Sequence, residues 1–268
     1  MGRLEKAIER LKNQSGPAAA IRPPPGLRHG GAPAAFESIA ARARPIPLER
    51  DHLAANRILT EDADPTVRGA YKMLRTRILQ RMRASSWQGL AVTSASAGDG
   101  KSLTAVNLAI SIAGDVNQNV VLVDLDLRHS TVSRYLGLPV DVGVSDCLRR
   151  GIPVEDVLVR PDIERLLVLP NVHVEQHSSE LMASPKMEAL ARRLVRDDPG
   201  RIVIYDLPPI LSADDMLAFA PFADCVLFVI GERQTDRTEV LRARELLEEI
   251  NVVGTVLNRS DERTAAYY

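Results

Sequence analysis

The sequence predicts a doubly wound α/β fold, in which helices cover both faces of a mostly parallel sheet. Short, continuous runs of Val, Ile and Leu recur along the chain, and stretches of helical character separate them. Such runs are typical of strands that are buried on both faces of a parallel sheet. A glycine-rich segment follows the first run, and aspartates end two others. The runs are GLAVT (89–93), VVLVD (120–124), LLVLP (166–170), RIVIYD (201–206), CVLFVI (225–230) and VVGTVLN (252–258).

The composition describes a globular protein with an aliphatic core. Of 268 residues, 45% are hydrophobic but only 4% are aromatic. A formal net charge of −1 argues against bulk nucleic-acid binding. The charge is uneven, because residues 1–60 carry ten Lys/Arg and five Asp/Glu, and the remainder carries 24 and 30. Such a basic arm either meets a partner or an anionic membrane face, or is solvated without a target.

Cysteine usage and hydropathy predict a cytoplasmic protein. Cys147 and Cys225 lie far apart, and Cys225 falls inside an apolar run. Two such residues indicate buried thiols in a reducing compartment. No apolar run approaches the roughly 18 residues that span a bilayer, and the first residues lack the apolar core of a signal peptide. We therefore expect no transmembrane segment.

The first part of the chain is expected to lie outside the globular domain. Leu4, Ile8 and Leu11 follow helical spacing, so residues 1–13 predict a short amphipathic helix. Seven of the 17 prolines then fall within residues 15–47. This composition predicts a largely disordered linker over residues 14–63.

A single domain is predicted over residues 64–262, followed by a flexible tail at 263–268. Pro65 suits the first turn of a helix that begins near Asp64. The strand and helix pattern described above starts after this helix and continues to the tail.

The segment from Ala95 to Ser102 matches a phosphate-binding loop, in which a small residue and four others precede Gly-Lys-Ser. Gly98 and Gly100 allow backbone N–H groups to turn toward phosphate oxygens. Lys101 reaches the β- and γ-phosphates, and the Ser102 hydroxyl ligates Mg²⁺. A strand before and a helix after are the context that such a loop requires. The predicted ATP contacts in this segment are Ala97, Gly98, Asp99, Gly100, Lys101, Ser102 and Leu103.

Three aspartates and one asparagine at strand ends complete the predicted site. Asp206 ends the strand RIVIYD, where a carboxylate beside the phosphate loop holds Mg²⁺ directly or through water. Asp124 and Asp126 end a second strand on the same side, placed to bind metal and to accept a proton from a hydroxyl. Asn258 follows the last run and is expected to hydrogen-bond the nucleotide base.

These segments together resemble the Walker A, A′ and B motifs of bacterial tyrosine kinases, which are phosphate-loop autokinases of exopolysaccharide export. The motifs are TSASAGDGKS, VLVDLDLR and IVIYDLPP. The opening GRLEKAIERL resembles cytoplasmic autokinases of exosortase-associated clusters. The resemblance covers nearly the whole predicted domain and implies the sheet of a phosphate-loop NTPase.

The resemblance implies a role for each matching residue. Lys101 holds the phosphates of ATP, and Ser102, Asp124 and Asp206 hold Mg²⁺. Asp124 and Asp126 activate the incoming tyrosine hydroxyl. The predicted catalytic residues are Lys101, Asp124, Asp126 and Asp206.

The sequence departs from the family in two places. The family ends in a cluster of several tyrosines, whereas this chain offers Tyr267 and Tyr268 as phosphoacceptors. The family's ring-forming motif Glu-x2-Arg-x2-Arg is matched by Gly69, Lys72 and Arg75, and a lysine lacks the bidentate fork of arginine. Self-association as a ring or a dimer is therefore left open.

Two functions follow from these observations. The first is an ATP-dependent protein-tyrosine autokinase that regulates exopolysaccharide biosynthesis, chain length or export. It acts with an inner-membrane chain-length-determinant protein and is peripheral at that membrane through this partner. The alternative is a partitioning-type ATPase switch without kinase activity. Those ATPases carry a signature lysine where this chain has Ser96, which favours the first function.

Overall fold

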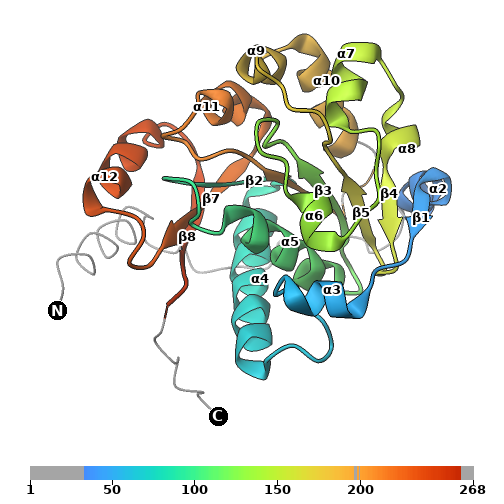
Figure 1. Cartoon of the computed structure of the whole chain (residues 1–268), viewed down its shortest axis with the longest axis horizontal. Coiled ribbons are helices and arrows are strands. Elements are labelled where there is room, and N and C mark those ends of the chain that lie inside the picture. Colours follow the sequence, from blue (N-terminus) through green and yellow to red (C-terminus); the bar gives the residue numbers. More distant parts are fainter. Residues whose placement is uncertain (1–32, 196–197, 199, 261–268) are drawn as a thin grey trace. The chain divides into compact units, whose positions relative to one another are not determined.

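The computed structural model describes residues 33–195, 198 and 200–260, and it confirms the predicted fold class. Its strands form one eight-stranded sheet in the order β1-β4-β5-β3-β6-β2-β7-β8 (Figure 1). Neighbouring strands are parallel, except that β4 runs antiparallel to β5. The strands are β1 (Arg44–Ile46), β2 (Gly89–Ser94), β3 (Asn119–Asp124), β4 (Val159–Pro161), β5 (Leu166–Leu169), β6 (Arg201–Asp206), β7 (Cys225–Gly231) and β8 (Val252–Asn258).

Helices cover both faces of this sheet, and each layer has its own apolar cluster. The first layer comprises α3 (Arg50–Ala55), α4 (Pro65–Ser85), α5 (Lys101–Ala113) and α6 (Val132–Leu136). The second comprises α2 (Pro33–Arg42), α7 (Val144–Arg150), α8 (Val154–Val157), α9 (Ser178–Met182), α10 (Pro185–Val195), α11 (Asp215–Phe219), the 3₁₀ turn η1 (Ala220–Phe222) and α12 (Arg237–Leu246).

The central strands are continuously apolar because both of their faces are buried. Along β3, Val121 and Val123 join the cluster under the second layer, while Val120 and Leu122 join the other. Successive side chains of a strand point to opposite faces, so a strand covered on both sides needs apolar residues at every position. The six predicted runs are all strands of the sheet.

Helix α4 begins where the sequence predicts. Pro65 is its first residue, and the Asp64 carboxylate accepts a hydrogen bond of 2.7 Å from the backbone N–H of Thr66. This cap satisfies one of the donors that the first turn of a helix leaves without a partner.

The predicted linker over residues 14–63 is wrong from residue 33 onward. Residues from Pro33 onward form α2, β1 and α3, and β1 pairs with β4 at one edge of the sheet. Phe36, Ile46 and Leu53 are buried in the two apolar clusters. Well-spaced apolar side chains thus dock this segment on the domain despite its proline content. The predicted helix over 1–13 and the tail over 263–268 lie outside the described residues.

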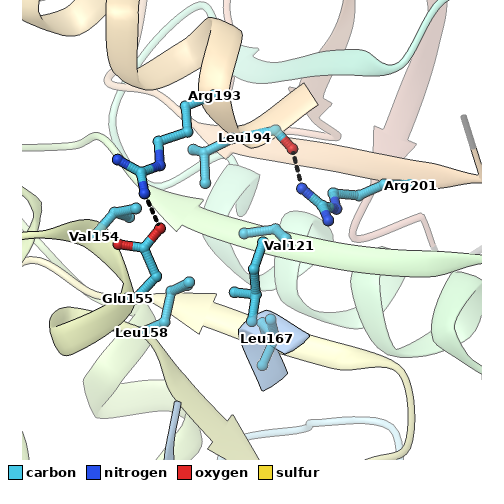
Figure 2. A pocket seen from close by; sticks show the side chains of 9 residues that line it. Val121, Val154, Glu155, Leu158, Leu167, Arg193, Leu194 and Arg201 are labelled. Atoms are coloured by element: carbon cyan, nitrogen blue, oxygen red, sulfur yellow. Dashed lines mark hydrogen bonds and ion pairs between the residues drawn. The ribbon is translucent and has the colours of Figure 1, made fainter. Parts of the chain in front are cut away.

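A small pocket lies where α2, α8 and α10 meet the sheet (Figure 2). Ile39, Val121 and Leu167 give it an apolar lining. Its polar groups already have partners, because Glu155 pairs with Arg193 and the Arg201 guanidinium donates to the carbonyl of Leu194 at 2.8 Å. Such a pocket serves packing, and the predicted site residues line no part of it.

Across the described part of the chain, the helices are too short or too polar to cross a membrane.

Candidate active site

The predicted site lies at the carboxyl ends of three adjacent strands, β3, β6 and β2. Asp124 and Asp206 are opposite each other in the register of β3 and β6, and Asp206 is opposite Val92 of β2. Parallel strands end at the same edge of a sheet, so the two aspartates and the loop that follows β2 converge there. This edge is where open α/β sheets bind their ligands.

The phosphate loop joins β2 to α5 and needs its glycines. Gly98 and Gly100 have φ angles of +89° and +91°, a region that residues with a Cβ rarely enter. A Cβ at Gly100 would lie only 2.1 Å from Nδ2 of Asn258. Gly100 is also the N-cap of α5, so the loop presents the positive end of a 13-residue helix to any bound phosphate.

Lys101 is the centre of the site's charge. Its side chain is almost fully buried, with Nζ 2.8 Å from Oδ2 of Asp126 and 3.4 Å from Oδ1 of Asp206. Burial acts to lower the pKa of Lys101, but the charges of Asp206 and Asp126 outweigh it and raise that pKa. The ammonium is therefore charged at neutral pH and ready to bind phosphate oxygens.

Asp206 has an unused buried oxygen. Its side chain is completely buried, and Oδ2 has no hydrogen-bond partner. Burial raises the pKa of Asp206, although the nearby charge of Lys101 acts in the opposite direction. A buried carboxylate oxygen without a donor calls for a cation or an ordered water.

The residues at this point therefore fit Mg²⁺. Within the described ranges, the acidic, histidine and cysteine side chains form no cluster that would hold a metal ion unaided. Magnesium in phosphoryl-transfer enzymes takes one or two protein ligands and completes its shell with water and phosphate oxygens. Asp206 with the neighbouring Ser102 hydroxyl is a donor set of that kind.

Asp124 is held differently from the other two aspartates. Its carboxylate accepts hydrogen bonds from three backbone N–H groups, those of Asp126 at 3.2 Å and of Thr131 and Val132 at 3.0 Å each. Burial, followed by the charge of Asp206, raises the pKa of Asp124 well above its usual value. Asp124 thus fixes the loop between β3 and α6, and its predicted contact with metal stays a prediction.

The two oxygens of Asp126 have different partners. Its Oδ1 accepts a hydrogen bond from the backbone N–H of His129 at 3.0 Å, while Oδ2 lies 2.8 Å from the Lys101 ammonium. A carboxylate that shares a mobile ammonium with bound phosphate is available as a proton acceptor.

The remaining predicted ATP contacts lie along the loop and at the end of β8. Ala97 is exposed, Leu103 packs on the apolar cluster of the first layer, and the Asp99 side chain is fully buried. The Asn258 amide donates to the backbone carbonyl of Asp99 at 2.8 Å. Asn258 therefore supports the loop, and its contact with a base stays a prediction.

Sequence reasoning missed the contacts around the phosphate loop. The Thr235 hydroxyl bonds the Asp99 carboxylate, and the Ser96 hydroxyl bonds Glu239 of α12. The pattern Asp-x-x-Glu at 236–239 signals the capping box with which α12 starts. It gives no sign that Glu239 also reaches the loop, since that pairing spans 143 residues.

A second missed contact orders the segment after β3. Nε of Arg128 lies 3.2 Å from Oδ2 of the buried Asp215 and donates to the Ser178 hydroxyl at 2.9 Å. The first residue of α11, Asp215, is thus linked to the segment after β3 through Arg128.

The positions that match the ring motif lie on α4. Gly69 has open space around it, whereas the Arg75 guanidinium donates to the carbonyl of Ser111 in the same chain at 2.8 Å. Arg75 is thus engaged in joining α4 to α5. Tyr267 and Tyr268 lie outside the described residues.

Comparison with known proteins identifies relatives of this chain, although no family model matches it. It is 30% identical to "Tyrosine-protein kinase YwqD" of Bacillus subtilis over 190 residues, which are 70% of this chain and 79% of the relative. It is 27% identical to "Succinoglycan biosynthesis transport protein ExoP" of Rhizobium meliloti over 227 residues, 80% of this chain and 27% of the relative.

Solved structures share the fold of this chain. The crystal structure of the chimerical protein CapA2B2 has a TM-score of 0.71 and 26% identity, and the match covers 85% of this chain and 100% of that one. The cell-division ATPase MinD of Pyrococcus furiosus reaches a TM-score of 0.54 and covers 64% of this chain. With its strand-end aspartates, its Lys101-centred loop and this likeness to YwqD, the chain belongs to the bacterial tyrosine-protein kinases.

Proposed function

We propose that this protein is an ATP-dependent protein-tyrosine autokinase that regulates exopolysaccharide biosynthesis, chain length or export. The observation that carries the proposal is the buried Lys101 at the phosphate loop, bound between Asp126 and Asp206. Tyrosine kinases among the relatives support the activity. A relative named for succinoglycan biosynthesis and transport supports the process.

The described residues divide the work of phosphoryl transfer between them. The loop backbone and the start of α5 hold the phosphates, and Lys101 neutralises the charge of the transferred group. Mg²⁺, held by Asp206 and Ser102, would add positive charge on the phosphate oxygens. Lys101 moves toward the phosphates when it binds them, which weakens its pair with Asp126. Asp126 then accepts the proton of a tyrosine hydroxyl as that oxygen bonds to phosphorus and ADP leaves.

The partner and the acceptors belong to the same proposal. An inner-membrane chain-length-determinant protein is the proposed activator, and it would keep this cytoplasmic protein at the membrane. The CapA2B2 chimera and the greater length of ExoP, of which this chain matches 27%, support such a pairing. Tyr267 and Tyr268 are the proposed phosphoacceptors, and self-association would bring one chain's tail to another's site.

Intact-mass spectrometry after incubation with Mg-ATP tests the proposal. The wild-type chain should gain the mass of one or two phosphates. Lys101→Met should gain none, because the phosphates lose their cation. The double variant Tyr267→Phe/Tyr268→Phe should also gain none while it still binds ATP. The same three chains are also incubated with a cytoplasmic segment of the proposed chain-length-determinant partner.

Two other outcomes have clear meanings. If the double variant gains phosphate, the phosphoacceptor is a tyrosine other than Tyr267 and Tyr268. ATP turnover by the wild type without any gain in mass, with or without the activator, would contradict the kinase and support the ATPase switch.

A further inference from the structure

The turn after β7 contacts the phosphate loop through hydrogen bonds. Residues 232–236 form this turn, which joins β7 to α12. The Thr235 hydroxyl accepts a hydrogen bond from the backbone N–H of Gly231 at 2.9 Å and donates one to Oδ1 of Asp99 at 2.7 Å. The Thr235 hydroxyl therefore links the backbone at the end of β7 to the phosphate loop.

The carboxylate of Asp99 holds the loop from within. It is completely buried, and its second oxygen accepts from the backbone N–H of Ser96 at 3.1 Å. The turn approaches so closely that a Cβ at Gly231 would lie 2.9 Å from Oδ1 of Asp99. Asp99 thus fixes the curve of the loop between Ser96 and Gly100, while Thr235 fixes Asp99.

A second link joins the loop to α12. The Ser96 hydroxyl donates to Oε1 of Glu239 at 2.7 Å, and Oε2 of the same side chain accepts from the backbone N–H of Asp236 at 2.9 Å. The hydrogen bond from Ser96 is the main cause that lowers the pKa of Glu239. The segment 96–99 is therefore attached at Asp99 to the turn and at Ser96 to α12.

We propose that Thr235 is a positioning residue for ATP. By its hydrogen bond to Asp99 it keeps the phosphate loop curved, with backbone N–H groups converging on the place of the phosphates, before the nucleotide arrives. Without that bond, ATP has to order the loop as it binds, and affinity falls accordingly. This inference rests on nucleotide binding at the loop, as the proposed function does.

The test compares four full-length chains: wild type, Thr235→Val, Thr235→Ser and Thr238→Val. Valine keeps the shape of threonine and removes the hydroxyl. Serine restores the hydroxyl. Thr238 is exposed near the start of α12, three residues further along the chain, and serves as the matched control. The dissociation constant of Mg-ATP is measured by calorimetry, and the KM and kcat of autophosphorylation are measured alongside the Tm without nucleotide.

Loss of a hydrogen bond to a buried carboxylate should weaken ATP binding and raise KM about tenfold in Thr235→Val. Its kcat should change less than about threefold, since the reacting groups are untouched. Thr235→Ser and Thr238→Val should match the wild type. If the valine variant does not fold, Thr235→Ala removes the hydroxyl without a branched side chain and should show the same weakening.

Three results would overturn the inference. ATP could bind Thr235→Val as tightly as the wild type, serine could fail to restore affinity, or kcat could fall while the dissociation constant stayed unchanged. Failure of the proposed kinase is a separate outcome, because a chain that binds ATP and gains no phosphate still reports on Thr235 through calorimetry.

Discussion

The buried carboxylate of Asp206 is expected to lower the stability of the nucleotide-free protein. Its carboxylate is completely buried at the end of β6, one of its oxygens has no partner, and Asp124 lies opposite it. Lys101 is the cation that faces this carboxylate, and it is shared with Asp126. Buried like charges in excess of their counterion destabilise a fold, and such strain is common at active sites.

Asp206→Asn should therefore stabilise the nucleotide-free protein while it abolishes phosphorylation. The amide keeps the shape of the carboxylate and removes one negative charge. We expect Tm to rise by roughly 2–4 °C, the shift that about 1 kcal/mol produces in a domain of this size. Differential scanning calorimetry measures it. A lower Tm than the wild type would show that the Lys101–Asp206 pair stabilises the fold after all.

The raised pKa values of Asp124 and Asp206 predict the direction of a pH dependence. A carboxyl whose pKa rises on folding binds its proton more tightly in the folded state. Its contribution to stability is full below the ordinary carboxyl pKa and is lost as the pH rises through the raised value. In Tm measurements from about pH 5 to about pH 8 without nucleotide, the wild type should lose more stability than Asp206→Asn. Parallel curves would contradict this.

At the scale of elements, the segment that precedes α4 belongs to the folded domain. Ile46 of β1 is 6% exposed and joins the apolar cluster of the first layer, while β1 itself pairs with β4. Ile46→Ala should cost about 2 kcal/mol or more of the free energy of unfolding. Urea denaturation measures this cost.

Arg44 of the same strand provides the matched control. Its side chain and that of its ion-pair partner Asp141 are both exposed, and Nη1 of Arg44 lies 3.9 Å from Oδ1 of Asp141. Arg44→Ala should therefore change the free energy of unfolding by less than about 0.5 kcal/mol. Equal and small effects of the two substitutions would mean that β1 contributes little to the domain.

The elements that could be predicted are mostly those whose sequence reflects burial. Five of the six predicted strands are buried at nearly every position because the sheet is covered on both faces, whereas β8, at the edge, is partly exposed. Strands β1 and β4 are three residues each, RPI and VRP, and a proline and an arginine in so short a run hide any pattern. Their place depends on pairing with distant residues, which no local signal reports.

In the candidate site, too, residues in local sequence patterns could be predicted, and residues that depend on distant contacts could not. Gly98, Lys101 and Asp206 could be predicted, since a phosphate loop and a strand-end carboxylate are local patterns with a known chemical purpose. Thr235 and Glu239 could not, because the turn and the helix that carry them are more than 130 residues away from the loop in the chain. Their roles depend on β2 and β7 being neighbours in the sheet.

At the scale of the whole described domain, nucleotide binding should raise the free energy of unfolding. The phosphate loop joins β2 to α5, and α5 is buried along almost its whole length between the sheet and α4. A non-hydrolysable ATP analogue with Mg²⁺ at about 100 times its dissociation constant should raise Tm by roughly 5–10 °C. Lys101→Met should show no such rise. An equal rise in that variant would place the nucleotide elsewhere.

The order of the strands separates the two ends of the described chain. Strand β1 occupies one edge of the sheet and β8 the other (Figure 1). With about 4.8 Å between neighbouring strands, the two edges are roughly 30 Å apart. The described chain therefore enters the domain at one flank of the sheet, where α2 and β1 lie, and reaches the opposite flank only with its last strand, β8 (Figure 1).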